Sequence, residues 1–69
     1  MEKINYVVIV SNIGTVYDGS NYKQANREFS EHKKLIKLNY GSWSCECVVL
    51  YFNGEIDREY FSPDYNYNI

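Results

Sequence analysis

Two runs of consecutive apolar residues, Tyr6–Val10 and Val48–Phe52, most constrain how this chain can fold. Both are rich in β-branched and aromatic side chains, which favour β-strands. Alternate residues of a strand point to opposite faces of a sheet, so an unbroken apolar run predicts a strand that is covered on both faces. The chain has only 69 residues, a length that permits one domain with a marginal core. The sequence must therefore provide two covers for one small sheet.

One cover is a helix that we expect between Asn21 and Leu38. Asn21 is a favourable N-cap residue, and Gln24 completes a capping-box pattern. Gly41 is a plausible C-cap. Apolar or half-polar residues recur at spacings of three and four and form a single stripe; they are Tyr22, Ala25, Phe29, His32 and Ile36. One such helix covers one face of a sheet.

Two further strands are expected, at Thr15–Tyr17 and at Glu55–Phe61. The second follows Asn53-Gly54, a strong hairpin signal after the strand Cys45–Phe52. Two registers remain open for this hairpin. A two-residue type I′ turn pairs Tyr51 with Ile56, whereas a bulged three-residue loop pairs Leu50 with Ile56.

The assembled fold class is α+β: a small, mostly antiparallel sheet of ββαββ order with one helix packed across one face. Residues 1–61 form this single domain. Residues 62–69 form a Tyr/Asn-rich tail, which we expect to fray because Pro63 ends the strand. For the second face of the sheet we expect a second copy of the chain, hence a homodimer or larger homo-oligomer. The alternative is that the tail folds back over this face.

Charge and cysteine content restrict the partners. The net charge is −2 and the isoelectric point is near 5.2, which argues against nucleic acid as the main partner. No apolar run approaches the roughly 20 residues of a membrane span. Cys45 and Cys47 stand two apart, a spacing that suits a disulfide poorly. We therefore expect reduced cysteines and a cytoplasmic protein without a signal peptide.

Residues that carry chemistry are scarce. The single histidine, His32, lies on the apolar stripe of the expected helix. Together with Cys45 and Cys47 it provides at most three metal ligands, without a zinc spacing. We therefore expect a protein that is not an enzyme and that has no cofactor or metal.

Two groups of residues are candidates for contact with a protein partner. Tyr40 and Trp43 lie in a short loop, and exposed aromatic residues dominate binding energy at interfaces; alternatively, Trp43 closes the end of the core. The acidic residues Glu55, Asp57 and Glu59 alternate along the last strand and are expected to share a face. They meet a basic partner or imitate a phosphate backbone, unless they only protect an edge strand.

A second class of function is small-ligand binding. The segment Gly14–Gly19 lacks the ending of a P-loop, yet it leads to a helix N-terminus whose amides can hold an anion. A nucleotide-like signal would then meet Tyr17, Gly19, Ser20 and Asn21, and an oligomer would sequester it.

Several motifs together resemble those of small uncharacterised proteins encoded by bacteriophages. These motifs are Ile13–Gly19, Gln24-Ala25, Leu38–Gly41, Asn53–Ile56 and Glu59-Tyr60. The similarity extends over residues 6–60. The chain has Ser42-Trp43 where such proteins tend to have an Arg-Ala type pair.

The resemblance implies a role by binding rather than by catalysis. Small phage proteins of this kind often block a host enzyme or disarm an antiviral defence. It therefore implies an inhibitor of a host or defence protein, acting in the cytoplasm of the host cell. A nucleic-acid mimic or nucleic-acid-binding module is a weaker alternative.

Overall fold

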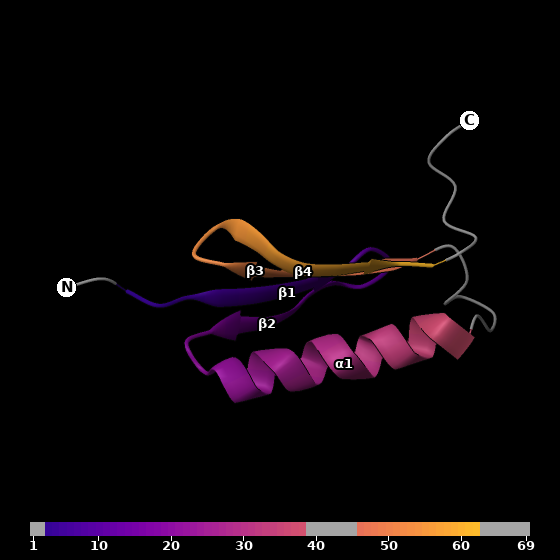
Figure 1. Cartoon of the computed structure of the whole chain (residues 1–69), viewed down its shortest axis with the longest axis horizontal. Coiled ribbons are helices and arrows are strands. Elements are labelled where there is room, and N and C mark those ends of the chain that lie inside the picture. Colours follow the sequence, from indigo (N-terminus) through magenta and orange to yellow (C-terminus); the bar gives the residue numbers. More distant parts are fainter. Residues whose placement is uncertain (1–2, 39–45, 63–69) are drawn as a thin grey trace.

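The computed structural model describes residues 3–38 and 46–62. In this described part of the chain, a sheet and one helix form two layers (Figure 1). The elements follow in the order β1 (Tyr6–Val10), β2 (Gly14–Gly19), α1 (Tyr22–Leu38), β3 (Cys47–Phe52) and β4 (Glu55–Phe61). The α+β class and the ββαββ order predicted from the sequence are confirmed.

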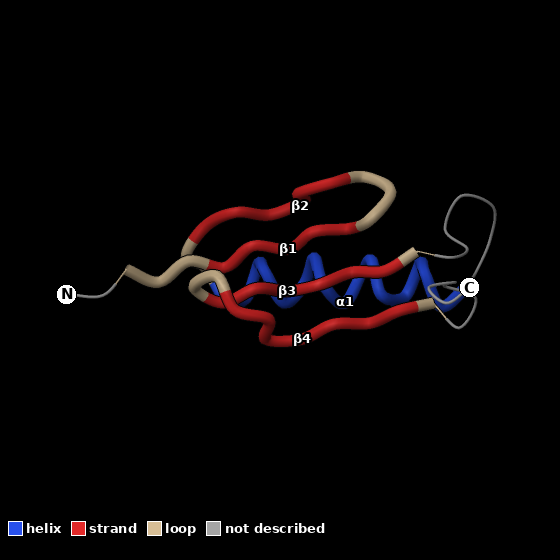
Figure 2. Tube along the Cα trace, turned by 90° about the horizontal axis from the view of Figure 1, so that it is seen from above, coloured by secondary structure: helices blue, strands red, loops and turns tan. Residues whose placement is uncertain are grey.

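The four strands form one antiparallel sheet in the order β2-β1-β3-β4. The two apolar strands, β1 and β3, are therefore the central ones, and Val8 pairs with Leu50. Figure 2 views the sheet from the side opposite α1, which lies behind the strands. Within the described residues, α1 is the only helix beside the sheet, and it leaves this face without a helical cover.

The hairpin between β3 and β4 begins in the type I′ register and then departs from both registers that the sequence left open. Asn53 and Gly54 both have positive φ, 50° and 87°, as a type I′ turn requires. Tyr51 accordingly pairs with Ile56. The register then shifts, because Leu50 pairs with Arg58 and leaves Asp57 as an extra residue. A bulge of this kind bends its strand, and in Figure 1 the start of β4 rises away from α1.

The helix begins where the sequence predicts, and its N-cap is fully formed. The Gln24 amide donates a hydrogen bond to Asn21 Oδ1 at 3.1 Å. The Asn21 amide donates to the Tyr17 hydroxyl oxygen at 2.9 Å. In a capping box the side chain at the third position would accept this second bond. Here a tyrosine from β2 takes that place and ties the start of α1 to the sheet.

The core lies between α1 and the two central strands. Its fully buried members are Val8, Val10, Ala25, Phe29, Ile36, Val48 and Leu50. Ala25, Phe29 and Ile36 belong to the stripe predicted for the helix, whose remaining members Tyr22 and His32 are exposed and half-buried. β2 is longer than the Thr15–Tyr17 segment expected, because its pairing with β1 extends from Gly14 to Gly19. The tail after residue 62 and the proposed C-cap at Gly41 lie outside the described residues.

Candidate functional site

The sheet presents one face to the helix and another to the surroundings. Val8, Val10, Val48 and Leu50 are buried beneath α1. Alternation along a strand places the residues between them on the opposite side. That side, which we call the open face, carries Val7, Ile9, Val49 and Tyr51 on the central strands.

The residues paired with these four extend the open face to both edges. On β2, Asp18 pairs with Val7 and Thr15 with Ile9. On β4, Ile56 pairs with Tyr51 and Glu59 with Val49. The four central side chains are half-buried by one another, whereas Ile56 keeps 57% of its surface exposed. The open face is thus apolar in the middle, and one acidic residue stands on each edge strand.

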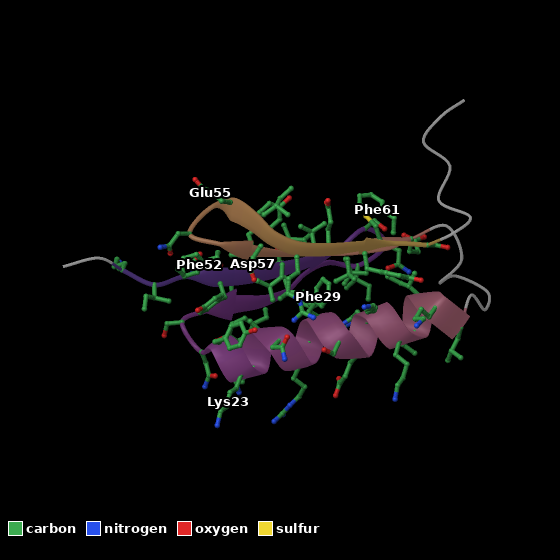
Figure 3. All side chains as sticks on the ribbon, in the orientation of Figure 1. Lys23, Phe29, Phe52, Glu55, Asp57 and Phe61 are labelled. Carbon is green, nitrogen blue, oxygen red and sulfur yellow. The ribbon has the colours of Figure 1, made fainter. Side chains whose placement is uncertain are left out.

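The second candidate surface is the acidic edge, which we define as Glu55, Ile56, Asp57 and Glu59 of β4. All four residues are exposed. The bulge at Asp57 interrupts the strict alternation from which a single acidic row was predicted. Figure 3 shows Glu55 on the bent start of the strand. The expectation of one regular carboxylate row is therefore wrong, and a bent acidic segment with Ile56 at its centre takes its place.

The hairpin tip that carries the acidic edge is held by polar contacts with the chain before β1. The Asn5 amide donates to Asn53 Oδ1, and the Asn53 amide donates back to the Asn5 carbonyl, both at 2.8 Å. The Asn5 side chain also donates to Asp18 Oδ1 at 3.0 Å. Asn5 therefore links both hairpins at one end of the sheet, which limits the freedom of the tip.

Arg58, the basic residue of β4, turns toward the helix. Its guanidinium lies 4.7 Å from the centre of the Phe29 ring, and it donates a hydrogen bond to Asn26 Oδ1. The sequence alone did not reveal this role, because the position depends on the bulge. The consequence is that β4 directs its one cation toward α1, while its three carboxylates are exposed.

Charge is divided between the two layers. α1 carries five basic residues, Lys23, Arg27, Lys33, Lys34 and Lys37, against two acidic ones, Glu28 and Glu31. In the described remainder, five acidic residues, Asp18, Glu46, Glu55, Asp57 and Glu59, stand against Lys3 and Arg58. Lys23 points away from the sheet in Figure 3. The net charge of −2 thus conceals a basic helix layer and an acidic sheet layer.

The alternative ligand site is occupied by contacts within the chain. Asn21 is engaged with Tyr17 and Gln24. A Cβ atom on Gly19 would stand 2.7 Å from the Tyr17 hydroxyl oxygen, so this hydroxyl packs directly on the glycine. Ser20 lies exposed between them. The structure brings these four residues together, but it directs Tyr17 into the helix cap.

The aromatic candidates Tyr40 and Trp43 lie outside the described residues, as does Cys45. Cys47 is a half-buried free thiol on β3. The His32 Nδ1 atom lies 2.8 Å from the Glu28 carbonyl oxygen, on the helix itself. Over residues 3–38 and 46–62, no three of the histidine, cysteine, aspartate and glutamate residues gather as metal ligands would.

No helix in the described part of the chain has the length and apolar character to cross a membrane. No family model matches the chain, and no match was found among curated proteins or among solved structures.

Proposed function

We propose that the protein is a non-enzymatic binding protein that inhibits a host or antiviral-defence protein through its acidic edge. The observation that carries this proposal is the position of Ile56. It is 57% exposed and lies between Glu55 and Asp57 in the sequence of β4, next to the bulge. A large exposed apolar side chain on an edge strand that also carries three exposed carboxylates is suited to a pocket with a basic rim.

The charge distribution supports a basic partner surface. The acidic edge belongs to the negatively charged sheet layer, while the compensating cations lie on α1. Complementary charge of this kind guides encounter and rejects acidic partners. The resemblance to small phage proteins directs the proposal toward a host target. Tyr40 and Trp43 remain predicted contributors to the same interface.

The test compares two variants, each lacking two carboxylates. Glu55→Gln with Asp57→Asn neutralises the acidic edge, and Glu28→Gln with Glu31→Gln is the matched control on α1. Each protein is immobilised, incubated with lysate of a bacterial host, and its bound proteins are quantified by mass spectrometry. We expect one host protein to be recovered with the wild type and with the helix control. The recovered amount of this protein should be lower by about tenfold or more with the edge variant.

The same binding should weaken when salt is raised from about 0.15 M to about 0.5 M, because exposed charge pairs are screened. Equal recovery by the edge variant and the helix control would show that the acidic edge is not the contact surface. Insensitivity to salt would contradict the charge argument by itself.

A further inference from the structure

We propose that α1 carries a second binding surface, which holds the phosphate backbone of a nucleic acid duplex without preference for its sequence. This surface is the basic row, which we define as Lys23, Arg27, Lys34 and Lys37. It belongs to the helix layer, whereas the acidic edge belongs to the sheet layer, so the inference goes beyond the proposed function. A net charge of −2 argues against a nucleic acid contact where charge is spread evenly, and this molecule divides its charge between two layers.

The basic row forms one strip along the outer side of the helix. At 3.6 residues per turn its side chains project within a sector of about 80°, and at 1.5 Å per residue they span about 21 Å of the axis. Within α1 this sector also contains Ser30, while Glu28 and Glu31 fall outside it. All four cations are exposed, and Lys23 points away from the sheet in Figure 3. α1 therefore presents a row of positive charge that no carboxylate interrupts.

Local helix stability does not account for the basic row. Cations stabilise the C-terminal end of a helix and are unfavourable at its N-terminal end. Lys37 lies in the last turn, but Lys23 lies in the first, where no acidic residue offsets its charge. Lys23 also repels Arg27 at the i,i+4 spacing. The described ion pair of α1 joins His32 to Glu28, and none joins the basic row to another described residue. An anion bound along the row would relieve this repulsion.

The composition of the row favours the backbone of a duplex over other anions. No aromatic ring stands in its sector, whereas single-stranded nucleic acid is held by rings on which its bases stack. The apolar stripe of α1 is buried against the sheet, so the helix cannot insert into a lipid surface as an interfacial helix does. A duplex carries one negative charge per 1.7 Å, hence about 12 phosphates over a length of about 21 Å. Each of the four cations can therefore meet a phosphate at the same time.

The acidic sheet layer lies too far away to cancel the charge of the row. A helix is about 10 Å thick, and α1 stands between the row and the strands (Figure 1). The Debye length is also about 10 Å at 0.1 M salt, so the carboxylates of the sheet are largely screened at the row. Lys33 is not counted, because its Nζ atom lies over the Tyr60 ring of β4, 5.4 Å from the ring centre. Four phosphate contacts are thus expected.

The test measures the fluorescence anisotropy of a labelled DNA duplex of about 20 base pairs as the full chain is added, at several salt concentrations. For four contacts, the logarithm of the association constant should fall against the logarithm of salt concentration with a slope of about −3.6. Arg27→Gln with Lys34→Gln removes two contacts. This variant should weaken binding at least tenfold at about 50 mM salt and bring the slope to about −1.8.

Lys3→Glu is the matched control, because it changes the net charge by the same two units at an exposed position before β1. It should leave the dissociation constant within about threefold. Far-UV circular dichroism confirms that each variant keeps the fold. The proposal is overturned if the wild type shows no binding at about 0.5 mM protein and about 50 mM salt, or if the control weakens binding as much as the double variant.

Competition distinguishes a duplex from other anionic partners. Unlabelled duplex should displace the labelled duplex at a lower concentration of charge than polyglutamate or vesicles of phosphatidylglycerol and phosphatidylcholine, because its phosphates are the most densely spaced. If polyglutamate competes equally well, the basic row is a contact for acidic proteins and the proposal is overturned. Equal competition by the vesicles overturns it in favour of a lipid surface.

Discussion

Asn21 shows how one residue joins the two layers through its side chain and its backbone amide. Its side-chain oxygen accepts the Gln24 amide, and its own amide reaches the Tyr17 hydroxyl. A helix leaves its first amides without partners inside the helix. Asn21 and Tyr17 satisfy two of the amides at this end, one by a local contact and one by a contact from β2. The position of α1 over the sheet therefore depends on the same few atoms that begin the helix.

Replacing Asn21 by alanine tests this cap. Asn21→Ala removes the acceptor of the Gln24 amide and should lower the free energy of unfolding by about 1 kcal/mol. Asn21→Ser is the control, because a serine oxygen also caps a helix and should recover most of that loss. Urea denaturation followed by circular dichroism at 222 nm gives both values. Equal losses for alanine and serine would mean that the side-chain oxygen does not stabilise the helix.

Phe29 is the largest of the buried side chains that pack α1 against the sheet. Its ring is 2% exposed, and Arg58 covers it from β4 at 4.7 Å. Phe29→Ala should cost about 3–5 kcal/mol, which is a large part of the total stability of about 3–10 kcal/mol expected for a chain of this size. Phe29→Leu should cost about 1–2 kcal/mol, because it fills most of the space.

Thermal unfolding of the two Phe29 variants distinguishes them. The alanine variant should be largely unfolded near 37 °C, while the leucine variant still unfolds in a cooperative transition. If both variants melt at the same temperature, Phe29 does not anchor the helix as the structure indicates.

The elements illustrate what a sequence of this kind can predict. β1, α1 and the Asn53-Gly54 turn were predicted because apolar periodicity, capping and turn preference are local properties. The bulge at Asp57 was not predicted, because it arises where Arg58 reaches Phe29 and Asn26 on another element. The bulge also changed the candidate site. The acidic residues of β4 were predicted to share one face from the alternation of a regular strand, and the bulge interrupts that alternation. The open face, in contrast, was predicted from the sequence, because two strands are apolar on both faces and one helix covers only one face of a sheet.

The whole sheet should show a gradient of stability from the centre to the edges. Among the described strands, β1 and β3 are bonded on both sides, whereas β2 and β4 each have one neighbouring strand. Amides of β1 and β3 should therefore exchange with deuterium most slowly and approach the rate of global unfolding. Exchange followed by nuclear magnetic resonance at two pH values checks this order. Amides of β4 that exchange as slowly as those of β3 would point to a neighbour beyond the outer strand.

The strand order also determines how the chain must assemble. β1 with β2, and β3 with β4, are hairpins that close within a few residues, an event of microseconds. The central pairing joins Val8 to Leu50, more than forty positions apart, and must wait for a long loop to close. During synthesis on the ribosome, the apolar edge of β1 therefore emerges well before the strand that will cover it. The strand pairing with the greatest sequence separation thus joins the two most apolar segments, β1 and β3. Newly made chains are therefore most prone to aggregate in the interval before these two strands pair.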